Sequence, residues 1–160
     1  MAQYKANVQA TSNATANTED VFIEVKAPAN VTFKFKRVRV GYSDGTATVG
    51  VDNHFRIKLA RWDTTTGGTS TSFTPIPVNA NSTASVASSC KIKNGTTALA
   101  LGTTNVTVVD LISVNGRALY EWLARDDDDM IVVKPASCFA VVIQSSVVSQ
   151  LFTATCDWIE

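Results

Sequence analysis

The sequence predicts an all-β protein that folds as a single-domain β-sandwich. Short segments in which apolar and polar residues alternate recur along the 160 residues, and clusters of Gly, Pro, Asn, Asp and Ser separate them. No segment shows the 3.6-residue period of an amphipathic helix. Hydrophobic residues make up 45% of the chain, which is enough for one buried core. Roughly eight to ten strands at near-even spacing favour a jelly-roll topology within this class.

The N-terminal segment differs from the rest of the chain. Residues 1–20 are mostly small and polar and show no clear period. We therefore expect a flexible N-terminal arm over 1–20, ordered only where a partner holds it, and a β-sandwich domain over 21–160. The alternation begins at residues 21–25, which predicts the first strand, and a Pro-containing turn follows.

Two longer strands are predicted at residues 31–42 and 54–62. In the second, the apolar residues share one parity and the polar residues the other: Phe55, Ile57 and Leu59 against His54, Arg56 and Lys58. Because side chains alternate across a strand, this pattern predicts one buried face and one basic face. In the first strand the apolar parity changes midway, which predicts a β-bulge near Lys36 and Arg37. A turn over 43–46 and a short strand over 49–51 are predicted between them.

The second half of the chain starts with residues 63–86, which are rich in Thr, Ser, Gly, Asn and Pro. A stretch this long with little expected structure predicts a surface loop with an interface or linker role. Asn115-Gly116 is the strongest short hairpin signal in the chain. The remaining alternating or apolar segments predict strands over 87–93, 105–113, 117–124, 130–134, 137–145 and 152–159.

Charge is balanced in total but unevenly placed. Fourteen basic and fourteen acidic residues give a formal net charge of zero. Residues 31–61 hold seven basic and two acidic groups, whereas residues 110–129 hold six acidic and two basic groups. Such segregation favours self-association or docking on a charged protein. As contacts with a partner or a second subunit we expect the basic residues and the four consecutive aspartates: Arg37, Arg39, Arg56, Lys58 and Arg61, with Asp126, Asp127, Asp128 and Asp129.

The sequence offers little catalytic or cofactor chemistry, so we expect no enzyme, no catalytic residue and no cofactor. His54 is the only histidine, and no serine has the context of an activated nucleophile. Asp126–Asp129 could supply oxygen ligands to Ca²⁺, but consecutive residues rarely converge on one ion, so a solvated or subunit-facing tip is the preferred interpretation and no metal is expected.

Nucleic acid and membranes are not expected partners. The balanced charge argues against nucleic-acid binding, and the aromatic residues alternate with the cations instead of sharing their face. No stretch approaches the ~20 apolar residues of a membrane span, and residues 1–5 lack the apolar core of a signal peptide. We expect a soluble protein that is not exported by the usual signal.

The three cysteines are Cys90, Cys138 and Cys156. Their spacing matches no metal-binding pattern. Buried free thiols are the preferred interpretation, and a bridge between Cys138 and Cys156 is the alternative.

Several segments together resemble a family of proteins. They are the strand and turn RVRVGYSDG (37–45), the strand and Thr/Gly/Pro loop FRIKLARWDTTTGGTSTSFTPIPVN (55–79), and the ending MIVVKPASCFAVVIQSS (130–146) with ATCDWIE (154–160). In order and pattern, residues 20–160 resemble the β-sandwich proteins that decorate or cement the heads of tailed bacteriophages, many of which have a jelly-roll fold like that of tumour necrosis factor.

The resemblance implies a structural virion protein located on the capsid surface and made in the host cytoplasm. Its partners would be the major capsid protein and copies of itself in a homotrimer. It would act by adding contacts between capsid subunits. Two alternatives stay open: a carbohydrate-binding β-sandwich that uses Trp62 or Trp122, and a subunit of a capsid shell.

Overall fold

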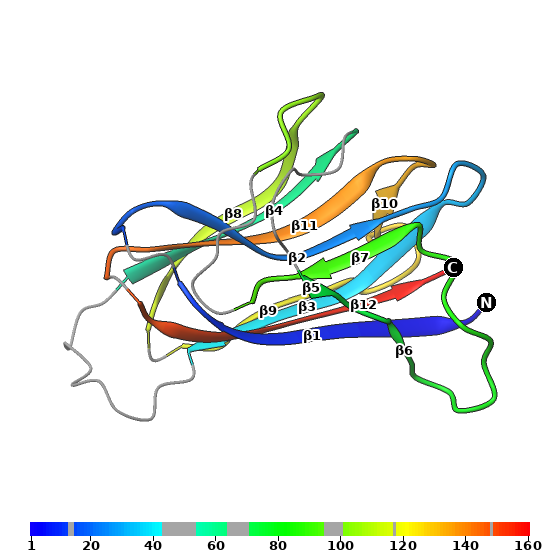
Figure 1. The fold of residues 1–160 in the computed structure, drawn as a ribbon, viewed down its shortest axis with the longest axis horizontal. Coiled ribbons are helices and arrows are strands. Elements are labelled where there is room, and N and C mark those ends of the chain that lie inside the picture. Colours follow the sequence, from blue (N-terminus) through cyan, green and yellow to red (C-terminus); the bar gives the residue numbers. More distant parts are fainter. Residues whose placement is uncertain (13–14, 43–53, 64–70, 95–100, 117, 148) are drawn as a thin grey trace.

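The computed structural model of the protein describes residues 1–12, 15–42, 54–63, 71–94, 101–116, 118–147 and 149–160. Over these residues twelve strands form two antiparallel six-stranded sheets that pack on each other (Figure 1). None of the described residues forms a helix that is long and apolar enough to cross a membrane. The prediction of an all-β, single-domain β-sandwich is confirmed.

The strands divide equally between two sheets. Sheet I contains β1 (Gln3–Thr11), β3 (Phe33–Tyr42), β6 (Ile76–Pro77), β9 (Tyr120–Leu123), β10 (Ile131–Val133) and β12 (Leu151–Ile159). Sheet II contains β2 (Glu19–Lys26), β4 (His54–Trp62), β5 (Thr71–Ser72), β7 (Ser89–Ile92), β8 (Thr107–Asn115) and β11 (Cys138–Ser145).

The strand order is that of a jelly roll. Sheet I runs β6-β1-β12-β3-β10, with β9 also paired to β3, and sheet II runs β5-β7-β2-β11-β4-β8. Apart from the short strands β5, β6 and β7, successive strands alternate between the sheets except at the steps from β4 to β8 and from β9 to β10. The first long strand lies beside the last, as the Greek-key connections of a jelly roll require.

The core fills the space between the sheets and is dominated by aromatic side chains. Phe35 of sheet I stacks on Phe139 of sheet II with ring centroids 4.0 Å apart, and Phe55 meets Phe152 edge-on at 5.0 Å. Trp158 is fully buried and contacts Tyr4, Phe33 and Phe35. In β3 and β4 the apolar parity supplies the inner face, as the alternation predicts, whereas β2 and β11 are buried on both faces.

The parity changes in the sequence correspond to bulges. In β3 the pairing with β12 shifts so that Lys36 is the extra residue, and Phe33, Phe35, Val38 and Val40 all face the core. The predicted bulge near Lys36 and Arg37 is confirmed. In β8 the pairing with β4 skips Val109 in the same way. In β3 the inserted residue resets the alternation, so one face stays buried along the strand, whereas β8 has no buried residue.

The prediction of a flexible N-terminal arm is wrong for Gln3–Thr11. This segment is strand β1, which pairs along its whole length with β12 and also pairs with β6. Its inward side chains Tyr4, Ala6, Val8 and Ala10 are buried. They are small apart from Tyr4, so the sequence shows weak hydrophobicity even though the backbone occupies the interior of sheet I.

The two long sides of the sandwich are closed differently. On one side, segment 71–94 supplies β6 beside β1 and β7 beside β2, and Thr83 accepts a hydrogen bond from the Tyr4 hydroxyl at 2.8 Å. The described part of the predicted 63–86 loop thus covers this side. On the other side, β8 ends sheet II while β9 and β10 end sheet I. No described strand pairs with their outer edges, and we call this region the open side.

Three further predictions have clear outcomes. Cys90, Cys138 and Cys156 are free and buried, so the preferred interpretation is confirmed. Asn115-Gly116 lies in a turn, with Ala118 donating its N–H to the Asn115 carbonyl, but the turn joins β8 of sheet II to β9 of sheet I and so makes no hairpin. The predicted turn at 43–46 and strand at 49–51 lie outside the described residues.

Candidate functional site

The open side exposes a group of aliphatic side chains. Eight of them, between 38% and 64% exposed, come from β8, β9, β10 and the residues beside them: Val106, Val108, Val109, Leu111, Ile112, Leu119, Leu123 and Val132. Side chains of this size and exposure offer on the order of 80 Å² each. Leu123 and Val132 lie opposite Arg37 and Lys34 on the outer face of sheet I, and Leu111 lies opposite Lys58 on the outer face of sheet II. The exposed aliphatic surface, roughly 600 Å² in all, is therefore divided between the two borders of the open side.

The edge of β8 also lacks the usual protection against pairing. Exposed edge strands in natural proteins carry Lys, Pro or short lengths that discourage another strand from adding. β8 has nine residues, no Lys, Arg or Pro, and one charged residue, Asp110. The Asp110 carboxylate points across to β9, where it accepts a 2.5 Å hydrogen bond from the Tyr120 hydroxyl. The open side is therefore a strong candidate for an interface.

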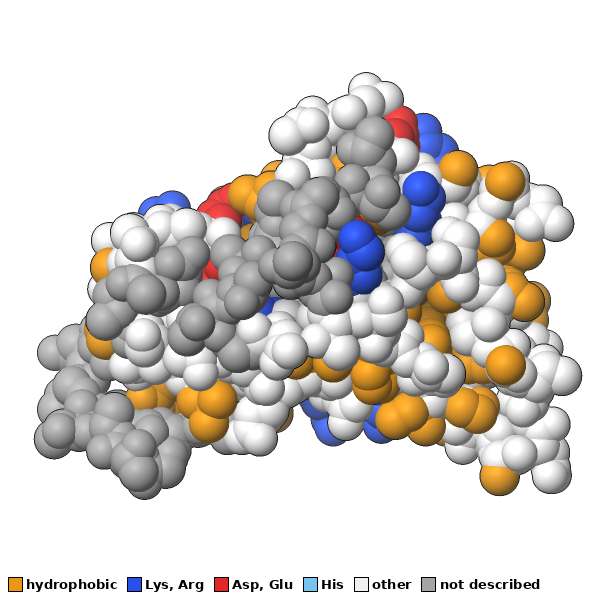
Figure 2. Space-filling model, viewed as in Figure 1, with side chains coloured by type: hydrophobic (Ala, Val, Ile, Leu, Met, Phe, Trp, Pro, Cys, Tyr) orange, Lys and Arg blue, Asp and Glu red, His pale blue; other side chains and the backbone are white. Residues whose placement is uncertain are grey.

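The five predicted basic contacts do not form one surface. Arg37 and Arg39 lie on the outer face of sheet I, where both donate from Nε to the same Glu121 oxygen at 2.8 and 2.7 Å. Arg56 and Lys58 lie on the outer face of sheet II, and Lys58 pairs with Glu19. Figure 2 likewise shows Lys and Arg side chains in several separate places on the visible face. Alternation within each strand could not reveal this division between sheets.

The four aspartates lie in an exposed loop at the edge of sheet I. β9 and β10 both pair with β3, and residues 125–130 loop out between them. Buried Ala124 and Met130 anchor the two ends of the loop. Asp126 Oδ1 accepts the main-chain N–H groups of Asp128 and Asp129 at 3.0 and 3.1 Å. Across the described residues, no group of three or more His, Cys, Asp or Glu side chains is placed to hold a metal ion.

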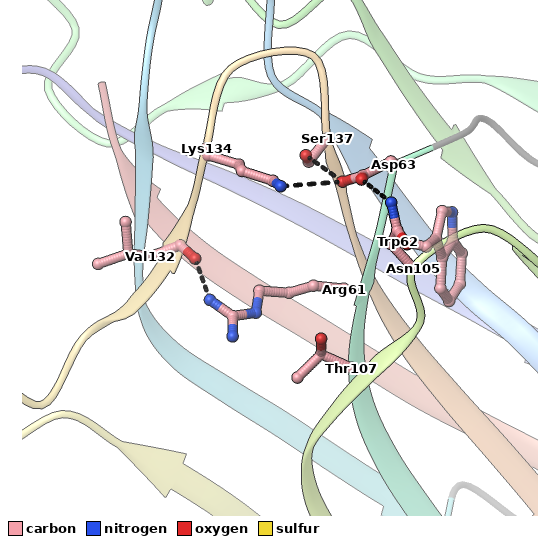
Figure 3. A pocket seen from close by; sticks show the side chains of 8 residues that line it. All are labelled: Arg61, Trp62, Asp63, Asn105, Thr107, Val132, Lys134 and Ser137. Atoms are coloured by element: carbon pink, nitrogen blue, oxygen red, sulfur yellow. Dashed lines mark hydrogen bonds and ion pairs between the residues drawn. The ribbon is translucent and has the colours of Figure 1, made fainter.

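Arg61 differs from the other four basic residues, because it lies in a pocket between the sheets at one end of the open side (Figure 3). The pocket has a volume of about 320 Å³ and is lined by Arg61, Trp62, Asp63, Asn105, Thr107, Val132, Lys134 and Ser137. The guanidinium reaches across from β4 and donates from Nη1 to the Val132 carbonyl of β10 at 2.6 Å. We call this cavity the Arg61 pocket.

Among the described residues that line the Arg61 pocket, Asp63 is the one acidic residue. Its carboxylate accepts hydrogen bonds from Asn105 Nδ2 at 2.6 Å and Ser137 Oγ at 2.8 Å, and Lys134 Nζ lies 3.6 Å away. The hydrogen bonds from Asn105 and Ser137, helped by the charge of Lys134, lower the pKa of Asp63. The carboxylate therefore stays ionised at neutral pH, and the pocket lining carries a net charge of plus one.

The sequence indicated two of these pocket residues, Arg61 as a partner contact and Trp62 in the carbohydrate-binding alternative. Asp63, Asn105, Thr107 and Lys134 come from three separate segments, and none stands in a motif. Only the meeting of β4, the segment before β8 and the turn after β10 brings them together.

The tryptophan residues do not offer the predicted platform for stacking sugars. Trp62 is 1% exposed, lies against Gly102, and donates its indole N–H to Glu24 at 3.1 Å. Trp122 is half-buried and packs against the main core. Trp62 therefore does not suit the carbohydrate-binding alternative, because its ring is buried.

Comparisons with known proteins give little. No family model and no curated protein matches the sequence. Among solved structures, the chain is similar to the T13 particle of infectious bursal disease virus, with a TM-score of 0.17 and 6% identity, and to the VP2 subviral particle of that virus, with a TM-score of 0.15 and 6% identity. The match covers 96% of this chain but 39% and 41% of those chains, about two fifths of their length. Likeness at this level supports no conclusion about fold or function.

Proposed function

We propose that this protein is a structural virion protein that binds the outside of a phage head and stabilises the lattice of the major capsid protein. It acts as a homotrimer and catalyses no reaction. It is made in the host cytoplasm and resides on the capsid surface. The proposal starts from the resemblance of residues 20–160 to decoration and cement proteins.

One structural observation supports an assembly role above others. The chain covers one side of its sandwich with segment 71–94 and leaves the other side with roughly 600 Å² of aliphatic surface and an unprotected nine-residue edge strand. An apolar side of this kind is stable in water when it is buried against another chain. In a homotrimer each copy can bury it against its neighbours.

Reconstitution on capsids tests the proposal. Purified protein is added to phage heads assembled without it, and binding is measured by co-sedimentation while head disruption is followed by heating. We expect saturable binding and an increase in the disruption temperature of the heads. Native mass spectrometry of the free protein is expected to report three copies.

The contradicting outcome is also specific. A protein that neither co-sediments with heads nor raises their disruption temperature at micromolar concentration would rule out the capsid role. A glycan array provides the counter-test, because selective binding of one sugar class would favour the carbohydrate-binding alternative.

A further inference from the structure

We propose that the Arg61 pocket receives a carboxylate from the Asp126–Asp129 loop of a second copy of this chain. The inference rests on the homotrimer of the proposed function and names the polar contact within its apolar interface. It also separates Arg61 from the other four basic residues, which lie on the outer faces of the two sheets.

The first argument is position. The Arg61 pocket opens at one end of the open side, where the Val132 carbonyl faces Arg61 and the exposed Val132 side chain points away from it (Figure 3). Thr107 of the lining lies between Val106 and Val108, which are both half-exposed. A second copy that buries these aliphatic side chains therefore also covers the pocket. The lining of the pocket is itself mainly polar, so it suits a charged group of the second copy rather than an apolar one.

The second argument is charge. The Asp63 carboxylate already accepts hydrogen bonds from Asn105 and Ser137 and pairs with Lys134. Its negative charge is therefore compensated within the pocket. Arg61 donates one of its N–H groups, to the Val132 carbonyl, and forms no ion pair in the described part of the chain. Lys134 is 71% exposed and is held only by its loose contact with Asp63. This leaves room and net positive charge for one carboxylate, which the planar guanidinium can bind with two parallel hydrogen bonds.

The third argument is the supply of carboxylates. The Asp126 carboxylate accepts main-chain N–H groups of its own loop. The side chains of Asp127 and Asp128 make no hydrogen bond or ion pair within the described residues. The loop projects from the edge of sheet I that borders the open side. A heterologous contact, with the loop of one copy in the pocket of the next, closes into a ring when the rotation between copies is 120°.

Charge reversal on the purified protein tests the contact. Self-association is measured by sedimentation equilibrium for wild type, Arg61→Glu, Asp127→Lys/Asp128→Lys, and the variant with all three changes. Either reversal alone is expected to raise the dissociation constant of the trimer by at least about tenfold, because like charges then meet in a covered site. The combined variant restores opposite charges and is expected to recover most of the affinity.

Two controls separate the contact from damage to the fold. Arg56→Glu reverses a charge on the same strand but on the outer face of sheet II, and it is expected to leave self-association unchanged. Lys134→Glu reverses a charge in the pocket without touching the bond from Arg61 to Val132, and a several-fold weakening is expected. Thermal melting monitored by circular dichroism verifies that each variant is folded.

Three results would overturn the inference: a monomeric wild type, an Arg61→Glu variant that assembles like wild type, or a combined variant that stays dissociated. Head binding is measured separately on the same samples. If the wild type is a monomer that still binds heads, the proposed contact is wrong and the capsid role still stands. If it forms a charge-dependent trimer that does not bind heads, the contact stands and the capsid role is wrong.

Discussion

The Tyr120 hydroxyl on β9 donates a 2.5 Å hydrogen bond to the Asp110 carboxylate on β8 and so joins the two sheets across the open side. Burial of the ring, then the bond to Asp110 and its negative charge, raise the pKa of Tyr120 far above its usual value. The hydroxyl therefore keeps its proton at neutral pH. Together with the bond from Arg61 to Val132, this pair holds the edges of sheets I and II in place.

Tyr120→Phe removes this hydrogen bond while keeping the ring. We expect a loss of about 1–3 kcal/mol in the free energy of unfolding, because a bond to a charged acceptor is lost in a partly buried place. Urea denaturation measures the change. In an Asp110→Asn background the same substitution is expected to cost less, and an equal cost in both backgrounds would show that the pair makes no joint contribution.

Gly102 is required by the Trp62 ring. A Cβ at this position would lie 2.2 Å from Trp62 Cγ, so Gly102→Ala forces the segment or the ring to move. We expect a loss of about 1–3 kcal/mol and a changed near-ultraviolet circular dichroism signal. Gly41→Ala is the matched control, since its Cβ would meet Leu119 and Thr153 at an ordinary 3.4 Å. Equal stability losses in the two variants would contradict this account.

Lys93 and Asp20 form an ion pair of 3.2 Å in which both side chains are fully buried. Lys93→Met leaves the Asp20 charge without this cation in a place that water cannot reach. The expected loss is about 3–5 kcal/mol. Arg39→Met, at the exposed pair with Glu121, is expected to cost less than about 1 kcal/mol. Denaturant titration compares the two, and a similar small loss in both variants would contradict the difference in burial.

Two aspartates are expected to titrate on opposite sides of their usual pKa of 3.8. Hydrogen bonds from Asn105 and Ser137 lower the pKa of Asp63, whereas burial raises the pKa of Asp157 despite nearby Lys5, Arg39 and Lys36. Carboxyl chemical shifts followed by NMR against pH check the order. Asp63 titrating at the higher pH would contradict it.

The same shifts have opposite effects on stability. A raised pKa means that the folded state holds its proton more tightly, so the contribution of Asp157 falls as pH rises from 3.8 through its folded pKa. Asp157→Asn is therefore expected to be more stable than wild type at neutral pH, by denaturant titration. The contribution of Asp63 is present above pH 3.8 and is lost as pH falls through its lowered pKa.

Local patterns predicted the strands well where large apolar residues alternate. Residues 54–62 correspond to β4, and the changed parity at Lys36 predicted the bulge in β3. The pattern failed for β1, whose inward positions are mainly Ala and Val. A strand between two partner strands is stabilised by backbone hydrogen bonds, and the pattern of its own side chains does not reveal these bonds.

The candidate interface was predicted only in part. The sequence identified the acidic loop and Arg61, but it grouped Arg61 with four cations that lie elsewhere. It interpreted residues 63–86 as an interface loop, whereas their described part covers the side of the sandwich next to β1 and β2.

In strands such as β4 the alternation of residues by itself determined which face is buried, because side-chain direction follows from position in a strand. Only the tertiary structure decided which side of the sandwich stays open. That choice depends on which strands become neighbours, and strand pairing is made by backbone groups that are the same in every residue. Segment 71–94 pairs with β1 and β2 and covers their side, whereas no described strand pairs with the outer edge of β8 beside the Arg61 pocket.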